Sequence, residues 1–173
     1  MAVAHISAER LREFLEYDPT SGLFIWRITR GSRAKAGDVA GNRHSSGYIV
    51  INTDGRLYYG HRLAWLYVYG AWPTNQIDHC DGNRANNRFS NLREATNAEN
   101  AQNMRKAHSD NLSGLLGASR NKRDGKWKAK IWFDRTSRYI GIFATAEEAH
   151  AAYLAEKSKV HPFSRPIDDS ANR

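Results

Sequence analysis

Residues 76–91 read QIDHCDGNRANNRFSN, and the interpretation of the whole N-terminal part of the chain depends on this stretch. Its many Asp, Asn and Gly residues are typical of a loop. It begins, however, with Ile-Asp-His, which has the pattern of a buried strand that ends in an acid and a base. Side chains alternate along a strand, so Asp78 and His79 are expected to face opposite ways and to do different tasks. We expect the strand to carry both side chains to an open edge.

The segments around this stretch predict a small mixed domain. Helical spacing, a hairpin signal and capping residues mark its elements. In chain order they are a helix capped by Ser7 with Leu11, Phe14 and Leu15 on its apolar face, a strand at 23–28, strands at 47–51 and 56–60 around an Asp54-Gly55 turn, a buried helix at 61–70 that ends in Gly70, and a helix at about 97–106 that opens with the capping box Thr96–Glu99.

The acid and the base suit the hydrolysis of a phosphodiester. That reaction needs a base for the attacking water and an electrophile for the developing charge. Asp78 would face a metal ion and His79 the water, and the amide oxygen of Asn100 would complete the metal site. Mg²⁺ is the predicted ion because it takes hard oxygen ligands, and Mn²⁺ is the alternative. The lone Cys80 excludes a Cys-rich zinc site, so no structural zinc is expected. An incidental polar turn is the competing interpretation.

Five short motifs occur in a fixed order along residues 77–100: Ile77-Asp78-His79, Asp81-Gly82-Asn83, Asn86-Asn87-Arg88, Asn91-Leu92-Arg93 and Glu99-Asn100. Together with the upstream segments LREFLEYDPTSGLFIWR, AGDVAG and HRLAWLYVYGAWP, they resemble the HNH endonucleases, also called ββα-metal nucleases. The branch they resemble is that of the phage- and intron-encoded homing endonucleases. The resemblance covers nearly all of residues 10–104.

The resemblance implies roles for several residues. His79 corresponds to the general base, Asp78 to a metal ligand, and Asn91 to the central asparagine, which would brace the loop that presents the histidine. Asn100 stands where many members have a last histidine, and its oxygen ligand suits Mg²⁺.

Neighbouring side chains have open or structural interpretations. Arg88 and Arg93 either contact phosphates or have structural roles. Asp81 and Asn83 are interpreted as turn residues that hydrogen-bond nearby backbone. His61 is expected to be structural or to contact phosphate.

Positive charge is concentrated in the second part of the chain. The net charge is +8, and residues 105–138 hold 10 Lys/Arg against 3 Asp/Glu, whereas residues 1–104 hold 12 against 10. Such a local excess is the usual footprint for a phosphate backbone. The same region predicts a three-stranded antiparallel meander with strands at 116–122, 126–133 and 138–144. A helix should follow, capped by Thr145–Glu148, with a small-residue face made of Ala149, Ala152, Tyr153 and Ala155.

Alternation along KWKAKIWF (126–133) separates two faces of the predicted sheet. The face expected to pack on the helix contains Trp127, Ala129, Ile131 and Phe133. The opposite, DNA-binding face is expected to contain Lys126, Lys128, Lys130 and Trp132, joined by Arg120, Lys122 and Arg138 from the flanking strands. An antiparallel sheet can enter the major groove of DNA. An ordinary solvated sheet face is the alternative.

The segments GASRNKRDGKWKAKI and RYIGIFATAEEAHAAY resemble the plant apetala-two/ethylene-response-factor DNA-binding domain over residues 114–158. Several arginines that read bases in the plant domains are replaced here, for example by Ser119 and Trp132. The resemblance therefore implies DNA binding of looser specificity and does not imply a target sequence.

The sequence thus predicts an α+β protein in which an HNH ββα-metal nuclease module precedes a small three-stranded antiparallel sheet packed on one helix. The predicted bounds are 1–104 for the nuclease module, 105–113 for a linker, 114–163 for the DNA-binding domain and 164–173 for a tail. The predicted function is metal-dependent cleavage of double-stranded DNA, of the homing type, nicking one strand. A non-catalytic DNA-binding regulator is the alternative.

The remaining expectations concern setting and assembly. No run of about 18 apolar residues is present, so neither a membrane span nor a membrane partner is expected. We expect a soluble, phage- or prophage-encoded protein that works in the cytoplasm of a bacterial host and binds DNA as a monomer.

Overall fold

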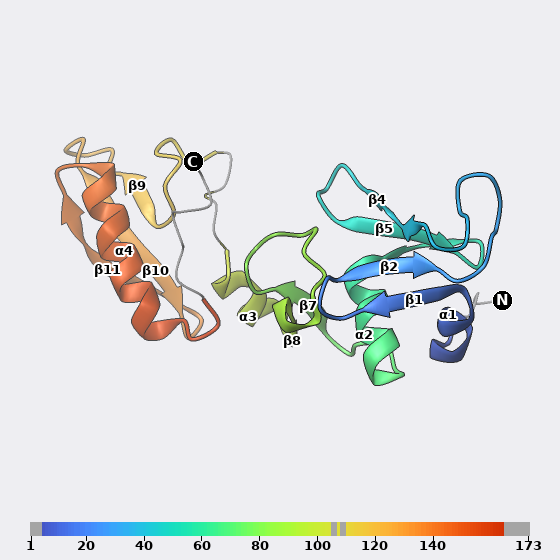
Figure 1. Ribbon diagram of the computed structural model, residues 1–173. Helices are drawn as coiled ribbons and strands as arrows, with labels where there is room; N and C mark the ends of the chain where they lie inside the picture. The colour runs from blue at the N-terminus through green and yellow to red at the C-terminus, as the bar shows by residue number, and fades with distance from the viewer. Residues whose placement is uncertain (1–4, 105–106, 108–109, 165–173) are drawn as a thin grey trace. The chain divides into compact units, whose positions relative to one another are not determined.

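The computed structural model describes residues 5–104, 107 and 110–164, and the chain divides into two compact units, residues 1–97 and 98–173 (Figure 1). Helices and small antiparallel sheets occur in both units, which confirms the predicted α+β class. The division falls earlier in the chain than the predicted end of the nuclease module at residue 104, and the predicted domain bounds stay a prediction. The predicted tail, apart from Ser164, lies outside the described residues, as do parts of the predicted linker.

The N-terminal unit opens with helix α1 (Ala8–Phe14), whose start confirms the predicted Ser7 cap because the Ser7 hydroxyl accepts from the Arg10 backbone N–H. The helix is shorter than its spacing suggests, since Leu15 begins strand β1 (Leu15–Asp18) instead. A turn then leads into β2 (Leu23–Trp26), which pairs with β1 and with the short strand β3 (Val39–Ala40).

A second sheet carries the predicted hairpin. Its strands are β4 (Asn42–Arg43), β5 (Ile49–Thr53) and β6 (Arg56–Tyr59), with β5 in the middle. Asp54 and Gly55 form the turn with φ of 53° and 75°, the left-handed values that a two-residue hairpin turn of this kind requires. Helix α2 (Gly60–Tyr69) follows directly and ends, as predicted, at Gly70 in the left-handed conformation.

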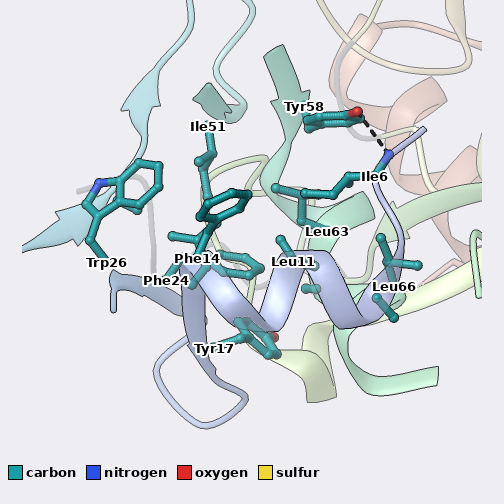
Figure 2. Close-up of a cluster of buried hydrophobic side chains, with 14 of the residues drawn as sticks. Ile6, Leu11, Phe14, Tyr17, Phe24, Trp26, Ile51, Tyr58, Leu63 and Leu66 are labelled. Carbon is teal, nitrogen blue, oxygen red and sulfur yellow. Dashed lines mark hydrogen bonds between the residues drawn. The ribbon is translucent and has the colours of Figure 1, made fainter. Parts of the chain in front are cut away.

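One hydrophobic core joins these elements (Figure 2). Side chains from α1, the β1–β2 hairpin, β5, β6 and α2 meet in it, and the Ile6 backbone N–H donates to the Tyr58 hydroxyl over 3.2 Å. Ile77 and Leu92 belong to the same core. They lie on strands β7 (Gln76–His79) and β8 (Leu92–Ala95), so the antiparallel pair that carries Asp78 and His79 is anchored to the body of the unit.

The sequence did not indicate β8 or the 3-10 helix η1 (Phe89–Asn91) before it. Helix α3 (Asn97–Gln102) begins at the predicted position. In chain order, two antiparallel strands and a helix therefore follow one another over residues 76–102, which is the predicted ββα order.

The C-terminal unit confirms the predicted meander and helix. Strands β9 (Ala118–Arg120), β10 (Trp127–Phe133) and β11 (Thr136–Phe143) form a sheet in the order β11-β10-β9, and α4 (Ala146–Val160) starts with the predicted capping box. Figure 1 shows α4 lying against this sheet. None of the described helices is both long and apolar enough to cross a membrane.

The contact between α4 and the sheet is built mostly from the predicted residues. Ala129 and Ile131 of β10 are fully buried, and they pack in clusters with Ala149 and Tyr153 of α4. Two predicted participants do not belong to this buried contact, because they lie at its margin: Ala155 is exposed, and Phe133, at the end of β10, is 40% exposed.

Candidate active site and nucleic-acid interface

Asp78 and His79 are buried, which corrects the expectation that β7 carries them to an open edge. Only 6% of Asp78 and 4% of His79 is exposed. The reason is that the polar loop after β7 (residues 80–91) folds back instead of extending into solvent. The Gly82 N–H donates to the His79 carbonyl, and the Cys80 N–H donates to the Asn91 carbonyl, both over 2.8 Å.

Asn91 holds this loop closed from its far end. Its side-chain oxygen accepts from the Asp81 N–H (3.0 Å), and its amide nitrogen donates to the Asp81 carboxylate (2.9 Å) and to the Asn86 carbonyl (2.8 Å). The Asn86 side chain donates to the other Asp81 oxygen over 2.7 Å. Every one of these bonds ties together parts of the segment that follows His79, so Asn91 fixes the conformation of the chain next to that histidine.

The turn interpretation of Asp81 and Asn83 is confirmed. The Asp81 carboxylate accepts from the Asn83 N–H over 2.8 Å, and the Asn83 side chain accepts from the Ala85 N–H over 3.1 Å. These are local bonds of the kind by which Asx side chains stabilise turns.

The His79 ring is oriented by Asn87, a residue that was not predicted to have a role in the site. His79 Nε2 lies 3.1 Å from Asn87 Oδ1. Because an amide oxygen only accepts, Nε2 is the nitrogen that carries the proton, and in a neutral ring Nδ1 is then the acceptor. Asn87 is itself 3% exposed, and its carbonyl accepts from the Tyr17 hydroxyl over 2.6 Å.

Two glycines allow Asn87 to sit this close to its neighbours. A side chain at Gly22, in the β1–β2 turn, would collide with the backbone of Asn87 and Arg88, and Gly22 also has a positive φ of 76°. A Cβ at Gly60 would lie 2.7 Å from the Asn87 side-chain nitrogen. The signal in the sequence was therefore spread over three distant segments, and no local pattern marks Asn87 as an orienting residue.

Aromatic rings surround the other faces of His79. His61, at the start of α2, meets it edge to face with ring centroids 5.1 Å apart, and the Tyr48 ring lies at 5.8 Å. Tyr59 stacks on His61 at 5.5 Å, and the Arg84 guanidinium lies 4.9 Å from the centroid of the Tyr48 ring. His79 thus sits in an aromatic environment that excludes most water.

This environment determines the protonation of both histidines. Burial lowers the pKa of His79, although the Asn87 hydrogen bond and the carboxylates of Asp81 and Asp78 oppose the effect. Burial, with His79 and Arg62 nearby, lowers the pKa of His61 to about 3. Both rings are therefore neutral at pH 7. The Nδ1 atom of His61 is buried and has no hydrogen-bond partner among the described residues.

Asp78 is paired with Arg93, its cross-strand partner on β8. The Arg93 Nε and Nη2 atoms donate to the same Asp78 oxygen over 3.0 and 2.7 Å. This ion pair is largely buried, as is expected of an arginine with a structural role. Arg88, by contrast, is exposed on the loop before η1.

The oxygen donors expected for a metal ion come from two units. Asp78 lies in the first unit, and Asn100 lies half-buried on α3 in the second. A carboxylate and an amide oxygen are ligands of the kind that Mg²⁺ prefers, so the donor set fits that ion in its chemistry. Among the residues that the structure describes, no three His, Cys, Asp or Glu side chains gather as a metal site would require.

The outer face of the C-terminal sheet, turned away from α4, carries Trp132 and two of the predicted basic residues. Lys128, Lys130 and Trp132 alternate with the buried positions of β10, and Trp132 is 66% exposed. Cross-strand partners share a face. Lys128 is opposite Ser119 and Ile142, Lys130 is opposite Tyr139, and Trp132 is opposite Ser137.

The three flanking basic residues do not join this outer face, which corrects the prediction. A β-bulge shifts the register of β11 against β10 between Ala129 and Lys130, so plain alternation fails along β11. Arg138 is consequently opposite the buried Ile131 and forms a 2.9 Å ion pair with Glu156 of α4.

Arg120 and Lys122 depart from the outer face for different reasons. Arg120 is opposite Trp127, whose side chain packs toward α4, and Lys122 lies in the turn beyond the end of β9. Both residues are exposed at the edge of the sheet.

Comparison with known proteins bears on the region around His79. Residues 58–102 match the HNH endonuclease family model. This HNH segment contains His61, Asp78, His79, Asn87, Asn91 and Asn100, and it spans the ββα order described above. It ends before the C-terminal sheet, so the resemblance of that sheet to the plant DNA-binding domain receives no support from it.

Two individual proteins are similar to parts of the chain. Protein 3.8 of Escherichia phage T7 is 39% identical over 72 residues, which are 41% of this chain and 59% of that protein. A solved structure of DNA binding and cleavage by the HNH homing endonuclease I-HmuI is 24% identical and gives a TM-score of 0.39 over 51% of this chain and 50% of its own. The chain thus spans 59% of the length of protein 3.8 and half the length of I-HmuI.

Proposed function

We propose that this chain is a metal-dependent DNA endonuclease of the HNH homing type, which nicks one strand of double-stranded DNA with His79 as general base. The observation that carries the proposal is the pair formed by His79 and Asn87, a buried histidine held in one orientation and one tautomer within the HNH segment. A buried histidine needs a hydrogen-bond partner in any role, so it is the position of this pair within the HNH segment that favours catalysis.

The protonation state of His79 suits a general base. Its Nε2 proton is directed to Asn87, so Nδ1 carries the lone pair that would take a proton from the attacking water. Burial lowers the pKa of the ring, which keeps it unprotonated at neutral pH. Preorganisation of this kind matters because a base contributes only when it is within hydrogen-bond reach of the proton that it removes.

Asp78 and Asn100 would hold Mg²⁺, or Mn²⁺ in its place. The ion would supply charge stabilisation for the phosphate and its leaving oxygen. Arg93 would orient the Asp78 carboxylate within the buried hairpin, since it donates twice to one of its oxygens. Arg88, exposed on the neighbouring loop, would contact the phosphate backbone.

The C-terminal unit would supply affinity and position on duplex DNA. Lys128 and Lys130 present charge from one strand of an exposed sheet, and the segment around them holds most of the positive excess of the chain. Arg120, Lys122 and Arg138 would contribute from the edge and the helix side of the sheet, not from its outer face. We further propose that the protein is phage-encoded, acts as a monomer in the host cytoplasm and has no membrane partner.

Incubation of the full chain with supercoiled plasmid tests this proposal. Open-circular DNA should accumulate in the presence of Mg²⁺ or Mn²⁺ and not with excess chelator. Asp78→Asn, which keeps an oxygen to accept from Arg93 but loses the charge, should need a higher metal concentration for half-maximal nicking. Intact supercoiled DNA at every metal concentration, from a chain that binds the plasmid, would contradict nuclease activity.

That outcome would instead support the second candidate function, a non-catalytic DNA-binding regulator. Two observations favour it: His79 is only 4% exposed, and the Asp78 carboxylate is engaged by Arg93. In a regulator, these groups would stabilise the fold of the first unit, and the basic sheet would carry the whole function.

A further inference from the structure

The outer face of the C-terminal sheet is unusual in combining positive charge with large exposed apolar side chains. Trp132 is 66%, Tyr139 55% and Ile142 44% exposed. All three project from the same face as Lys128 and Lys130, because each lies on β10 with them or directly opposite one of them on β11. A merely solvated face has no reason to expose three such side chains in one place.

The bulge in β11 creates this arrangement. Tyr139 and Ile142 are three positions apart, and in a regular strand they would face opposite ways. The register shift between Ala129 and Lys130 leaves Ile140 as an extra residue, which packs toward α4 in both apolar clusters. As a result, each rung of the outer face has one apolar side chain: Ile142 beside Lys128, Tyr139 beside Lys130, and Trp132 beside Ser137.

The spacing of these rungs fits duplex DNA. Residues two apart on a strand are separated by about 7 Å, which is close to two base-pair steps of about 3.4 Å each. A two-stranded ribbon can enter the major groove, where the C5-methyl group of thymine is the one apolar feature on the base edges. The lysines supply the charge that is complementary to the phosphates on either side of that groove.

We propose that Trp132, Tyr139 and Ile142 read thymine C5-methyl groups in the major groove, at intervals of about two base pairs. This inference rests on the proposed DNA binding by the C-terminal sheet and gives that sheet a sequence preference. Lys128 and Lys130 hold the sheet on any duplex, and the three apolar side chains favour duplexes that present methyl groups at the matching spacing.

Replacement of thymine by uracil tests the inference, since uracil lacks only the methyl group. Duplexes enriched from a random pool by binding to the full chain are amplified with either dTTP or dUTP, and affinities are measured with chelator present to prevent cleavage. The thymine duplexes should bind more tightly, by about fourfold for each methyl contacted, the ratio that corresponds to about 0.8 kcal/mol per buried carbon group.

Variants of the outer face separate the methyl contacts from backbone binding. Trp132→Ala or Tyr139→Ala should reduce the thymine-to-uracil affinity ratio, and both positions are exposed enough for the fold to persist, which circular dichroism checks. The matched control Lys130→Ala should weaken binding to both duplexes equally and leave the ratio unchanged.

Two results would overturn the inference. One is equal affinity of the unaltered chain for thymine and uracil duplexes. The other is a ratio that survives in both aromatic variants, because the discrimination would then arise elsewhere. Failure of the proposed function would give a different result. If the sheet were not the DNA-binding surface, replacing both Lys128 and Lys130 by alanine would leave the DNA affinity unchanged.

Discussion

His79 and Trp132 represent two opposite ways of presenting a functional side chain. His79 is 4% exposed and held by a hydrogen bond and two ring neighbours, Tyr48 and His61, whereas Trp132 is 66% exposed on an open sheet. A general base must be fixed to within a fraction of an ångström of its target, and burial provides that precision. A surface that meets a large polyanion needs reach and charge more than precision. The difference suggests that cleavage and affinity are assigned to different units.

The largest expected effect concerns His79. His79→Ala should lower the nicking rate by about 10² to 10⁴, the usual contribution of one general base. DNA affinity should remain within about twofold, because no phosphate contact is assigned to a side chain this buried. Single-turnover nicking and equilibrium binding, measured on the same preparation, check both parts. A variant that nicks within a few-fold of the original chain would remove His79 from this role.

Asn87→Ala should come next, with a rate loss of about 10² if the His79 ring turns away from its working orientation. The loss should appear at saturating DNA and leave the dissociation constant unchanged, which distinguishes misorientation from weaker binding. Asn52→Ala, at an exposed asparagine of β5, is the control and should change neither quantity. Equal rates for Asn87→Ala and this control would break the link between Asn87 and the base.

Arg93→Ala sharpens the comparison from the side of stability. Removing Arg93 takes two donated hydrogen bonds from the buried Asp78 carboxylate, so the free energy of unfolding should fall by about 2 kcal/mol. Arg88→Ala, at an exposed arginine nearby, should leave stability unaltered and weaken DNA binding instead. Chemical denaturation gives the free energy of unfolding of each variant, and binding assays give its DNA affinity. If the Arg93→Ala protein were as stable as the original chain but bound DNA weakly, Arg93 would instead be a phosphate contact.

The last effect is absent at neutral pH and concerns acid stability. The pKa of His61 is about 3 in the folded protein, against about 6.5 in an unfolded chain, so the unfolded state binds the extra proton between these values. Stability should therefore be fully present above pH 6.5 and be lost as the pH falls toward 3, by at most about 1.4 kcal/mol per pH unit. His61→Phe should show a shallower decline of melting temperature with falling pH, and His44→Gln, at an exposed histidine, should follow the original chain.

Local sequence patterns were sufficient to predict features that depend on a single helix or strand. Alternation along β10 predicted which side of the sheet Lys128 and Ala129 would face, and capping residues predicted the starts of α1 and α4. The fold class and the meander followed from these signals, since each depends on short-range periodicity.

Long-range packing accounts for what the sequence did not predict. Composition marked residues 80–91 as a loop, but the burial of Asn87 within it depends on close approaches to Gly22 and Gly60, which lie far away in the chain. The role of Asn87 follows from the same contacts. On β11, one inserted residue at the bulge reversed the side of Arg138, and alternation alone gives no sign of such an insertion.

The separation of cleavage from affinity is tested most directly by measuring both properties in the same three proteins. Nicking rate at saturating DNA and binding affinity over a series of salt concentrations are determined for the original chain, for His79→Ala, and for Lys128→Ala combined with Lys130→Ala. His79→Ala should lose the rate and keep the salt dependence of binding. The double lysine variant should keep most of the saturated rate, and its slope of log K against log salt should be shallower by about two, one for each lost phosphate contact. An unchanged slope in the double lysine variant, or a saturated rate as low as that of His79→Ala, would contradict the assignment of the two functions to two units.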